Sequence, residues 1–140
     1  MNLTRRETLA LGAGAAAAVL LPGMALASAE SDAAVEELTG GAAMRDGGIE
    51  LTAPEIAENG NTVPVEVSAP GAVSITLLAA GNPLPGVATF HFGPLSGEQR
   101  ASTRIRLAQT QDLIAIAKFE DGSVAKAERV VKVTIGGCGG

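Results

Sequence analysis

Aromatic residues are almost absent from this chain of 140 residues, which has no Trp, no Tyr and three Phe. Its hydrophobic core must therefore consist of Val, Ile, Leu and Ala, and it cannot contain the buried Trp of antibody domains. Charged residues are also few, at 18%, whereas 46% of the residues are hydrophobic. This balance suits one globular domain with little room for a second.

Histidine and cysteine occur only once each. His91 lies between Phe90 and Phe92, and no second His or Cys follows at a spacing that would suit a metal ligand set. We expect a histidine on the surface of a strand, no metal site and, in the absence of any cofactor motif, no cofactor. A chain with a single cysteine also lacks the cysteine pair of antibody domains.

The charge of the chain is acidic, with a formal net charge of −5. An acidic surface argues against nucleic acid as a ligand. Glu55, Glu58 and Glu66 are interpreted as solvated surface, because no substrate pocket accompanies them. Arg104 and Arg106 are interpreted as solvent-facing strand residues; as an alternative, this basic edge could contact an anion or a partner.

The first 27 residues have the features of an export signal. Arg5 and Arg6 precede an apolar run over residues 9–21, and small residues up to Ala27 provide a cleavage site, with Ala29 as an alternative. The paired arginines favour the twin-arginine route to the periplasm. The run is too short and too rich in glycine for a membrane anchor.

A cut after residue 27 would remove two Arg and one Glu, which changes the formal charge from −5 to −6. Twin-arginine export usually follows folding and assembly with a cofactor or a partner. Because no cofactor motif is present, we expect a partner protein. In an oxidising compartment, a single cysteine tends to be reactive or to pair between molecules.

The segment 28–48 is predicted to contain a short helix from Ser31 to Met44, capped by Ser31 or Asp32 and loosened near Gly40. The pattern then changes to short strands separated by turn residues. Seven are predicted, over residues 49–53, 62–67, 73–80, 87–92, 102–107, 112–119 and 125–135. This spacing is typical of a two-sheet, immunoglobulin-like β-sandwich, here over residues 49–135.

Strand faces can be assigned from the alternation of apolar residues. The inward positions of the third and last strands are predicted to be Val73, Ile75, Leu77, Ala79, Val131, Val133 and Ile135. Residues 112–119 are apolar on both faces, which places this strand in the centre of a sheet or against a partner. Asn59-Gly60-Asn61 is expected to form a tight turn, and Asp121-Gly122 a hairpin turn.

The chain ends in Gly136-Gly137-Cys138-Gly139-Gly140. Four glycines around one cysteine raise the entropic cost of any fixed conformation, so residues 136–140 are predicted to form a flexible arm. Five extended residues span about 17 Å from an anchor at Ile135. No cation or helix N-terminus adjoins the thiol in the sequence, and we expect a partner to activate it.

Several blocks of this chain resemble the SoxY family of sulfur-carrier proteins. They are Ile49-Glu50-Leu51, residues 54–60, Val63-Pro64-Val65, residues 103–108 with Thr110-Gln111, and residues 133–140. The resemblance runs from about residue 49 to the end, and its terminal block is the most specific.

The resemblance implies a covalent substrate carrier rather than an enzyme. It implies a heterodimer with a SoxZ-like partner and a thiol, Cys138, that holds sulfur intermediates. The haem enzyme SoxAX would join thiosulfate to this thiol, the manganese enzyme SoxB would release sulfate, and SoxCD, where present, would oxidise the remaining sulfur.

Two other functions remain open from the residues alone. The terminal Gly-Gly could be activated as a thiocarboxylate, as in ubiquitin-like sulfur carriers, although those act in the cytoplasm. Alternatively, the chain could be an exported assembly module in which Cys138 forms an intermolecular disulfide.

Overall fold

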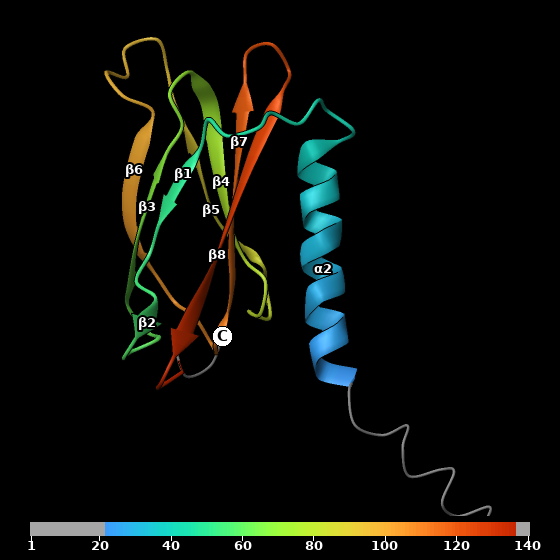
Figure 1. The fold of residues 1–140 in the computed structure, drawn as a ribbon, viewed down its shortest axis with the longest axis vertical. Coiled ribbons are helices and arrows are strands. Elements are labelled where there is room, and N and C mark those ends of the chain that lie inside the picture. The colour runs from blue at the N-terminus through green and yellow to red at the C-terminus, as the bar shows by residue number, and fades with distance from the viewer. Residues whose placement is uncertain (1–21, 137–140) are drawn as a thin grey trace, which may run out of the picture.

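A computed structural model describes residues 22–136, with side chains from Ala29 onwards. It shows a helix beside a two-layered β-sandwich (Figure 1). The predicted signal segment up to residue 21, and Cys138 with the three glycines Gly137, Gly139 and Gly140, lie outside the described residues. Within the described part of the chain, no helix has the length and hydropathy needed to cross a membrane.

Within residues 22–136, one helix is followed by eight strands. They are α2 (Pro22–Thr39), β1 (Glu50–Thr52), β2 (Ile56–Ala57), β3 (Val63–Ser68), β4 (Ala72–Ala79), β5 (Gly86–His91), β6 (Arg100–Ile105), β7 (Gln111–Phe119) and β8 (Val124–Val133). One sheet has the order β1-β3-β6 and the other the order β2-β8-β7-β4-β5. The predicted sandwich is confirmed.

The space between the two sheets is filled by aliphatic side chains, as the scarcity of aromatic residues predicts. Among the described residues, the largest side chains of this core with less than 2% exposure are all aliphatic: Ile75, Leu77, Leu107, Leu113, Val63, Val67 and Val131. Phe119 is the one buried aromatic residue in this part of the chain. Burying each of these side chains contributes about 1.5–3 kcal/mol to folding.

The face predictions are wrong at Val73 and Ile135. Between Ala72 and Ser74 the register of β4 with β7 shifts, so Val73 occupies a bulge and is 37% exposed. At the other end of the chain, β8 stops at Val133, and the alternation stops with it. Ile135 is 68% exposed.

The central strand β7 is buried on both faces, in agreement with its apolar sequence. Its inner face meets the other sheet. On its outer face, Ile114 and Ile116 pack with Leu78 and Val124 against residues 34–42. In this structure, helix α2 and the turn after it therefore cover the face that the sequence could equally assign to a partner.

Helix α2 begins at Pro22, earlier than the predicted start at Ser31. The alanine-rich stretch before Ser31 has a high helix propensity and continues the helix backwards, and Ser31 is buried within it. The helix ends at Thr39, where Gly40 and Gly41 adopt φ angles of +54° and +74° that favour glycine. The loosening predicted near Gly40 is thus the end of the helix.

Candidate functional site

The described part of the candidate site is the segment 133–136, which leads from β8 to Cys138. We call it the arm base. Figure 1 shows the C-terminal end of β8 beside β2, at the opposite end of the sandwich from the β7–β8 hairpin. The short parallel pairing of β2 with β8, Ile56 with Lys132 and Ala57 with Val133, brings residues 55–60 alongside the arm base.

Residues 57–60 hold the arm base from one side through main-chain groups. The amide of Thr134 donates to the carbonyl of Ala57 at 3.1 Å, and the amide of Gly60 donates to the carbonyl of Ile135 at 2.8 Å. The hydroxyl of Thr134 donates to the carbonyl of Glu58 at 3.1 Å. The β2–β8 pairing therefore continues two residues beyond the strands.

Thr110 holds the arm base from the other side. The β7–β8 ladder ends at the pair Gln111–Val131, so no main-chain group of β7 faces Val133. The hydroxyl of Thr110 takes that place: it accepts a hydrogen bond from the amide of Val133 at 2.9 Å and donates to its carbonyl at 3.4 Å. A side chain thus substitutes for a strand partner.

Gly136 lies in close contact with the loop between β6 and β7. A Cβ atom at this position would collide with the carbonyl oxygen of Ala108, closer than real Cβ atoms approach. The prediction assigned Gly136 to arm flexibility, whereas the structure gives it a steric role as part of the arm base. Cys138 follows Gly136 by two positions, about 7 Å of extended chain, which is shorter than the predicted reach.

A network of neutral side chains holds the loop against which Gly136 lies. Asn82 accepts from the amide of Ala108 at 3.0 Å and donates to the carbonyl of Arg106 at 2.8 Å. The buried amide of Gln111 donates to Asn82 at 2.9 Å and accepts from the amide of Gly81 at 2.8 Å. We call Asn82 and Gln111 the loop bracket.

The two sides of the arm base are also joined to each other. The amide of Leu107 donates to the carbonyl of Gly60 at 2.7 Å, and the side chain of Leu107 is fully buried. The turn at Asn59 is present as predicted, since its side chain accepts from the amide of Asn61 at 3.0 Å. Beyond forming a turn, however, Gly60 links residues 107 and 135.

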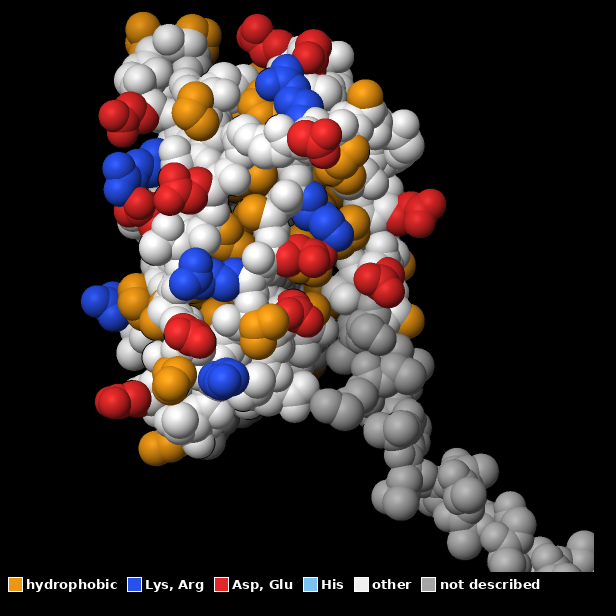
Figure 2. All heavy atoms as spheres, in the orientation of Figure 1, with side chains coloured by type: hydrophobic (Ala, Val, Ile, Leu, Met, Phe, Trp, Pro, Cys, Tyr) orange, Lys and Arg blue, Asp and Glu red, His pale blue; other side chains and the backbone are white. Residues whose placement is uncertain are grey.

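The hydrogen bonds of the arm base and the loop bracket come from main-chain groups and neutral side chains, with no ionised group among them. Three exposed apolar residues lie at this end of the molecule: Ile56, Leu84 and Ile135, with exposures of 56%, 80% and 68%. Elsewhere, acidic and basic side chains are interspersed over the face in Figure 2.

The side chains of the other candidate residues take no part in the hydrogen bonds of the arm base. His91 is exposed on β5, as predicted, and residues 22–136 contain no cluster of three or more His, Cys, Asp or Glu that could hold a metal ion. Glu55 and Glu58 are exposed, as expected. Glu66 is instead half-buried and paired: hydrogen bonds from Ser102 and then from Arg100 lower its pKa.

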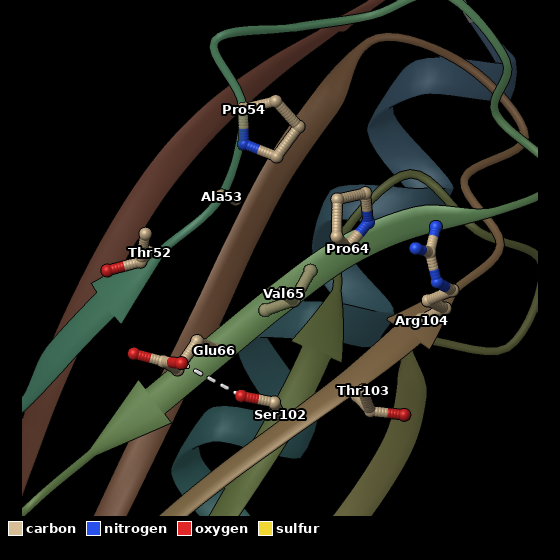
Figure 3. A pocket seen from close by; sticks show the side chains of 9 residues that line it. All are labelled: Thr52, Ala53, Pro54, Pro64, Val65, Glu66, Ser102, Thr103 and Arg104. Carbon is tan, nitrogen blue, oxygen red and sulfur yellow. Dashed lines mark hydrogen bonds between the residues drawn. The ribbon is translucent and has the colours of Figure 1, made fainter.

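Arg104 is exposed on the outer face of β6, and Arg106, directly after this strand, is exposed as well, in agreement with the predicted alternation. Arg104 also lines an open groove of about 620 Å³, shown in Figure 3. The groove lies where the chain leaves β1 at Ala53 and Pro54, and Glu66 and Ser102 bond to each other across part of its floor. It is separate from the arm base.

Comparison with known proteins identifies the family. The model of the family "Sulfur oxidation protein SoxY" matches residues 35–138. The solved structure of the sulfur carrier protein SoxY from Chlorobium limicola f thiosulfatophilum is 36% identical with a TM-score of 0.65, covering 76% of this chain and 98% of that one. No curated protein sequence matches.

The same fold occurs in more distant structures. A superoxide reductase (neelaredoxin) from Ignicoccus hospitalis is 22% identical with a TM-score of 0.54, covering 61% of this chain and 78% of that one. At this identity the likeness concerns the fold alone. The family match, by contrast, extends through the arm base as far as Cys138, and the chain belongs to the SoxY family, the sulfur carriers of the Sox system.

Proposed function

We propose that this protein carries thiosulfate-derived sulfur covalently on Cys138 and presents it to successive enzymes. One observation above all supports the proposal. Three segments that carry the family resemblance, residues 54–60, 103–111 and 133–136, are far apart in sequence and meet at the arm base, two residues before the only thiol.

The proposed chemistry begins with the thiol of Cys138 and thiosulfate. Formation of the S–S bond gives a cysteine S-thiosulfonate and releases one proton and two electrons, which the haem enzyme SoxAX accepts. Water then attacks the sulfonate sulfur in the site of SoxB, the bond to the sulfane sulfur breaks, and sulfate leaves. Cys138 retains a persulfide for oxidation or removal. The chain supplies the thiol and its tether, and the enzymes supply the catalysis.

The short tether has a consequence for the partner enzymes. Because Cys138 lies within about 7 Å of chain from Gly136, an enzyme with a deep site must approach the end of the sandwich. The side chains of Ile56, Leu84 and Ile135 are exposed at this end and are available for transient contacts. Glycines beside the thiol keep the tether thin enough to enter a narrow channel.

The proposal includes a compartment and a stable partner. The paired arginines and the apolar run in residues 1–27 support export to the periplasm by the twin-arginine route, with cleavage after Ala27 or Ala29. A heterodimer with a SoxZ-like protein would explain export in the folded state without a cofactor. After cleavage at Ala27, helix α2 would retain residues 28–39.

Replacement of the chromosomal residue by Cys138→Ser tests the proposed function. We expect thiosulfate-dependent oxygen uptake to fall to the background of a deletion strain, while the amount of exported protein is unchanged. A matched Ser68→Ala variant, at the end of β3, should oxidise thiosulfate at the normal rate. Normal oxidation by the Cys138→Ser strain would refute the covalent role and favour a thiocarboxylate. A constitutive disulfide dimer without sulfur adducts would favour the assembly module.

A further inference from the structure

We propose that Thr110 is a positioning residue that fixes the point from which Cys138 is tethered. Its hydroxyl closes the arm base where the β7–β8 ladder has already ended, and the loop bracket behind it holds the hydroxyl in place. Of the measurements that test it, only the KM for thiosulfate loading rests on the proposed function.

The register of β7 and β8 shows why a side chain is needed here. Gln111 pairs with Val131, and the same antiparallel register would place Gln109 opposite Val133. The loop has left the sheet at that point. Without Thr110, the amide and carbonyl of Val133 would have no partner on this side, whereas the hydroxyl satisfies both, at 2.9 and 3.4 Å.

The neighbours of Thr110 restrict its movement. The buried amide of Gln111 donates to the carbonyl of Gln109 at 3.0 Å, which closes a tight turn around Thr110. The same amide donates to Asn82, which in turn binds the amide of Ala108. Because Gly136 lies against the carbonyl of Ala108, the same hydrogen-bonded loop makes both the hydroxyl contact and the steric contact with the arm base.

Loss of the hydroxyl would move the start of the tether. The hydrogen bonds that hold the arm base would then come from residues 57–60 alone. Opening of these bonds would free the chain from Val133 onwards instead of from Gly136. Three additional residues add about 10 Å of extended chain. A longer tether lowers the effective concentration of its end at any one site, so an enzyme that docks on the end of the sandwich would meet Cys138 less often.

The test compares Thr110→Val, which has a similar shape without the hydroxyl, with Thr110→Ser, which retains it. Thr52→Val, at an exposed hydroxyl on β1 in the other sheet, is the matched control. The full chain is purified from its source with any partner that accompanies it. Amide hydrogen exchange is measured at Val133, and the mobility of a nitroxide attached to Cys138 is measured by electron paramagnetic resonance.

We expect exchange at Val133 to become at least tenfold faster in Thr110→Val and the nitroxide spectrum to become narrower. Both should return to the wild-type values in Thr110→Ser and be unchanged in Thr52→Val. The KM for loading of thiosulfate by the partner enzymes should rise at least threefold in Thr110→Val, while kcat and the reaction of Cys138 with a small maleimide stay the same.

Unchanged exchange and an unchanged nitroxide spectrum in Thr110→Val would overturn the proposal. Altered exchange with an unchanged KM would also overturn it, because Thr110 would then stabilise the loop without positioning the arm. If the wild-type protein is not loaded with thiosulfate at all, the proposed function fails, and exchange and spectrum alone decide the role of Thr110.

Discussion

The two ends of β8 are held in different ways. At its start, Arg45 lies 3.9 Å over the ring of Phe119 and donates hydrogen bonds to Asp121 and Ser123. The amide of Arg45 also donates to the carbonyl of Val124 at 2.8 Å. At its other end, the arm base is held by main-chain groups, by the neutral hydroxyls of Thr110 and of its own Thr134, and by a glycine contact.

Because of this difference, salt and pH affect the stability of the two ends of β8 differently. The exposed ion pair of Arg45 and Asp121 is screened by salt and weakened by acid. The bonds at the arm base contain no group that titrates or is screened. The hairpin end can therefore respond to salt and pH while the arm base stays constant, as the proposed presentation of sulfur on Cys138 would require.

The largest effect is expected for Gly136→Ala. The new Cβ would collide with the carbonyl of Ala108, and the simplest relief is detachment of the arm base. Local opening should become more favourable by about 1–3 kcal/mol, which corresponds to roughly 5- to 150-fold faster amide exchange at Thr134. Gly139→Ala is the control and should leave this exchange unchanged. Equal exchange in both variants would mean that the arm base does not extend to Gly136.

A second substitution tests the support of the arm base. Gln111→Leu removes the buried amide that bonds to Asn82 and to the amide of Gly81. Buried groups left without partners should lower the free energy of unfolding by about 1–3 kcal/mol. Gln109→Leu, at an exposed amide with one long contact, should change it by less than about 0.5 kcal/mol. Urea denaturation measures the free energy of unfolding of both variants. Equal losses in the two would contradict the role of the loop bracket.

The smallest effect concerns pH at the hairpin end. Hydrogen bonds from Ser123 and then from Arg45 lower the pKa of Asp121 from 3.8 to about 2. A lowered folded-state pKa stabilises the ionised form, so this contribution to stability is complete above about pH 4 and is lost as the pH falls from 3.8 through 2. Asp121→Asn removes it at every pH.

The difference in urea midpoint between wild type and Asp121→Asn should therefore shrink between pH 5 and pH 2. Glu66 also has a lowered pKa. Because Glu66 is present in both the wild type and Asp121→Asn, its contribution cancels in the difference between their urea midpoints. A difference that stays constant with pH would show that ionised Asp121 does not stabilise the hairpin end.

Local sequence patterns predicted most of the fold. Alternating apolar residues and turn signals located seven strands within a few residues of their observed bounds, and Gly122 adopts the positive φ angle that the predicted hairpin turn favours. The pattern missed β2, because Ile56 and Ala57 form a strand only through pairing with β8, more than 70 residues later. Pairing over that distance leaves no periodicity in two residues.

The candidate site was predictable in identity but not in its geometry. One cysteine among glycines directs attention to Cys138 from the sequence alone. The arm base depends on contacts such as that between Thr134 and Glu58, which are 76 residues apart, and on the close approach of Gly136 to Ala108. The one sequence signal for these contacts was the set of separate blocks that resemble the family, and the structure brings those blocks together.

Intact-mass spectrometry of the protein purified from cells oxidising thiosulfate tests the central claim most directly. The account predicts adducts with the masses of thiosulfate and of added sulfur atoms, located on Cys138, removed by a thiol reductant and absent from Cys138→Ser. A wild-type protein that carries only an unmodified thiol or a disulfide under these conditions would contradict it.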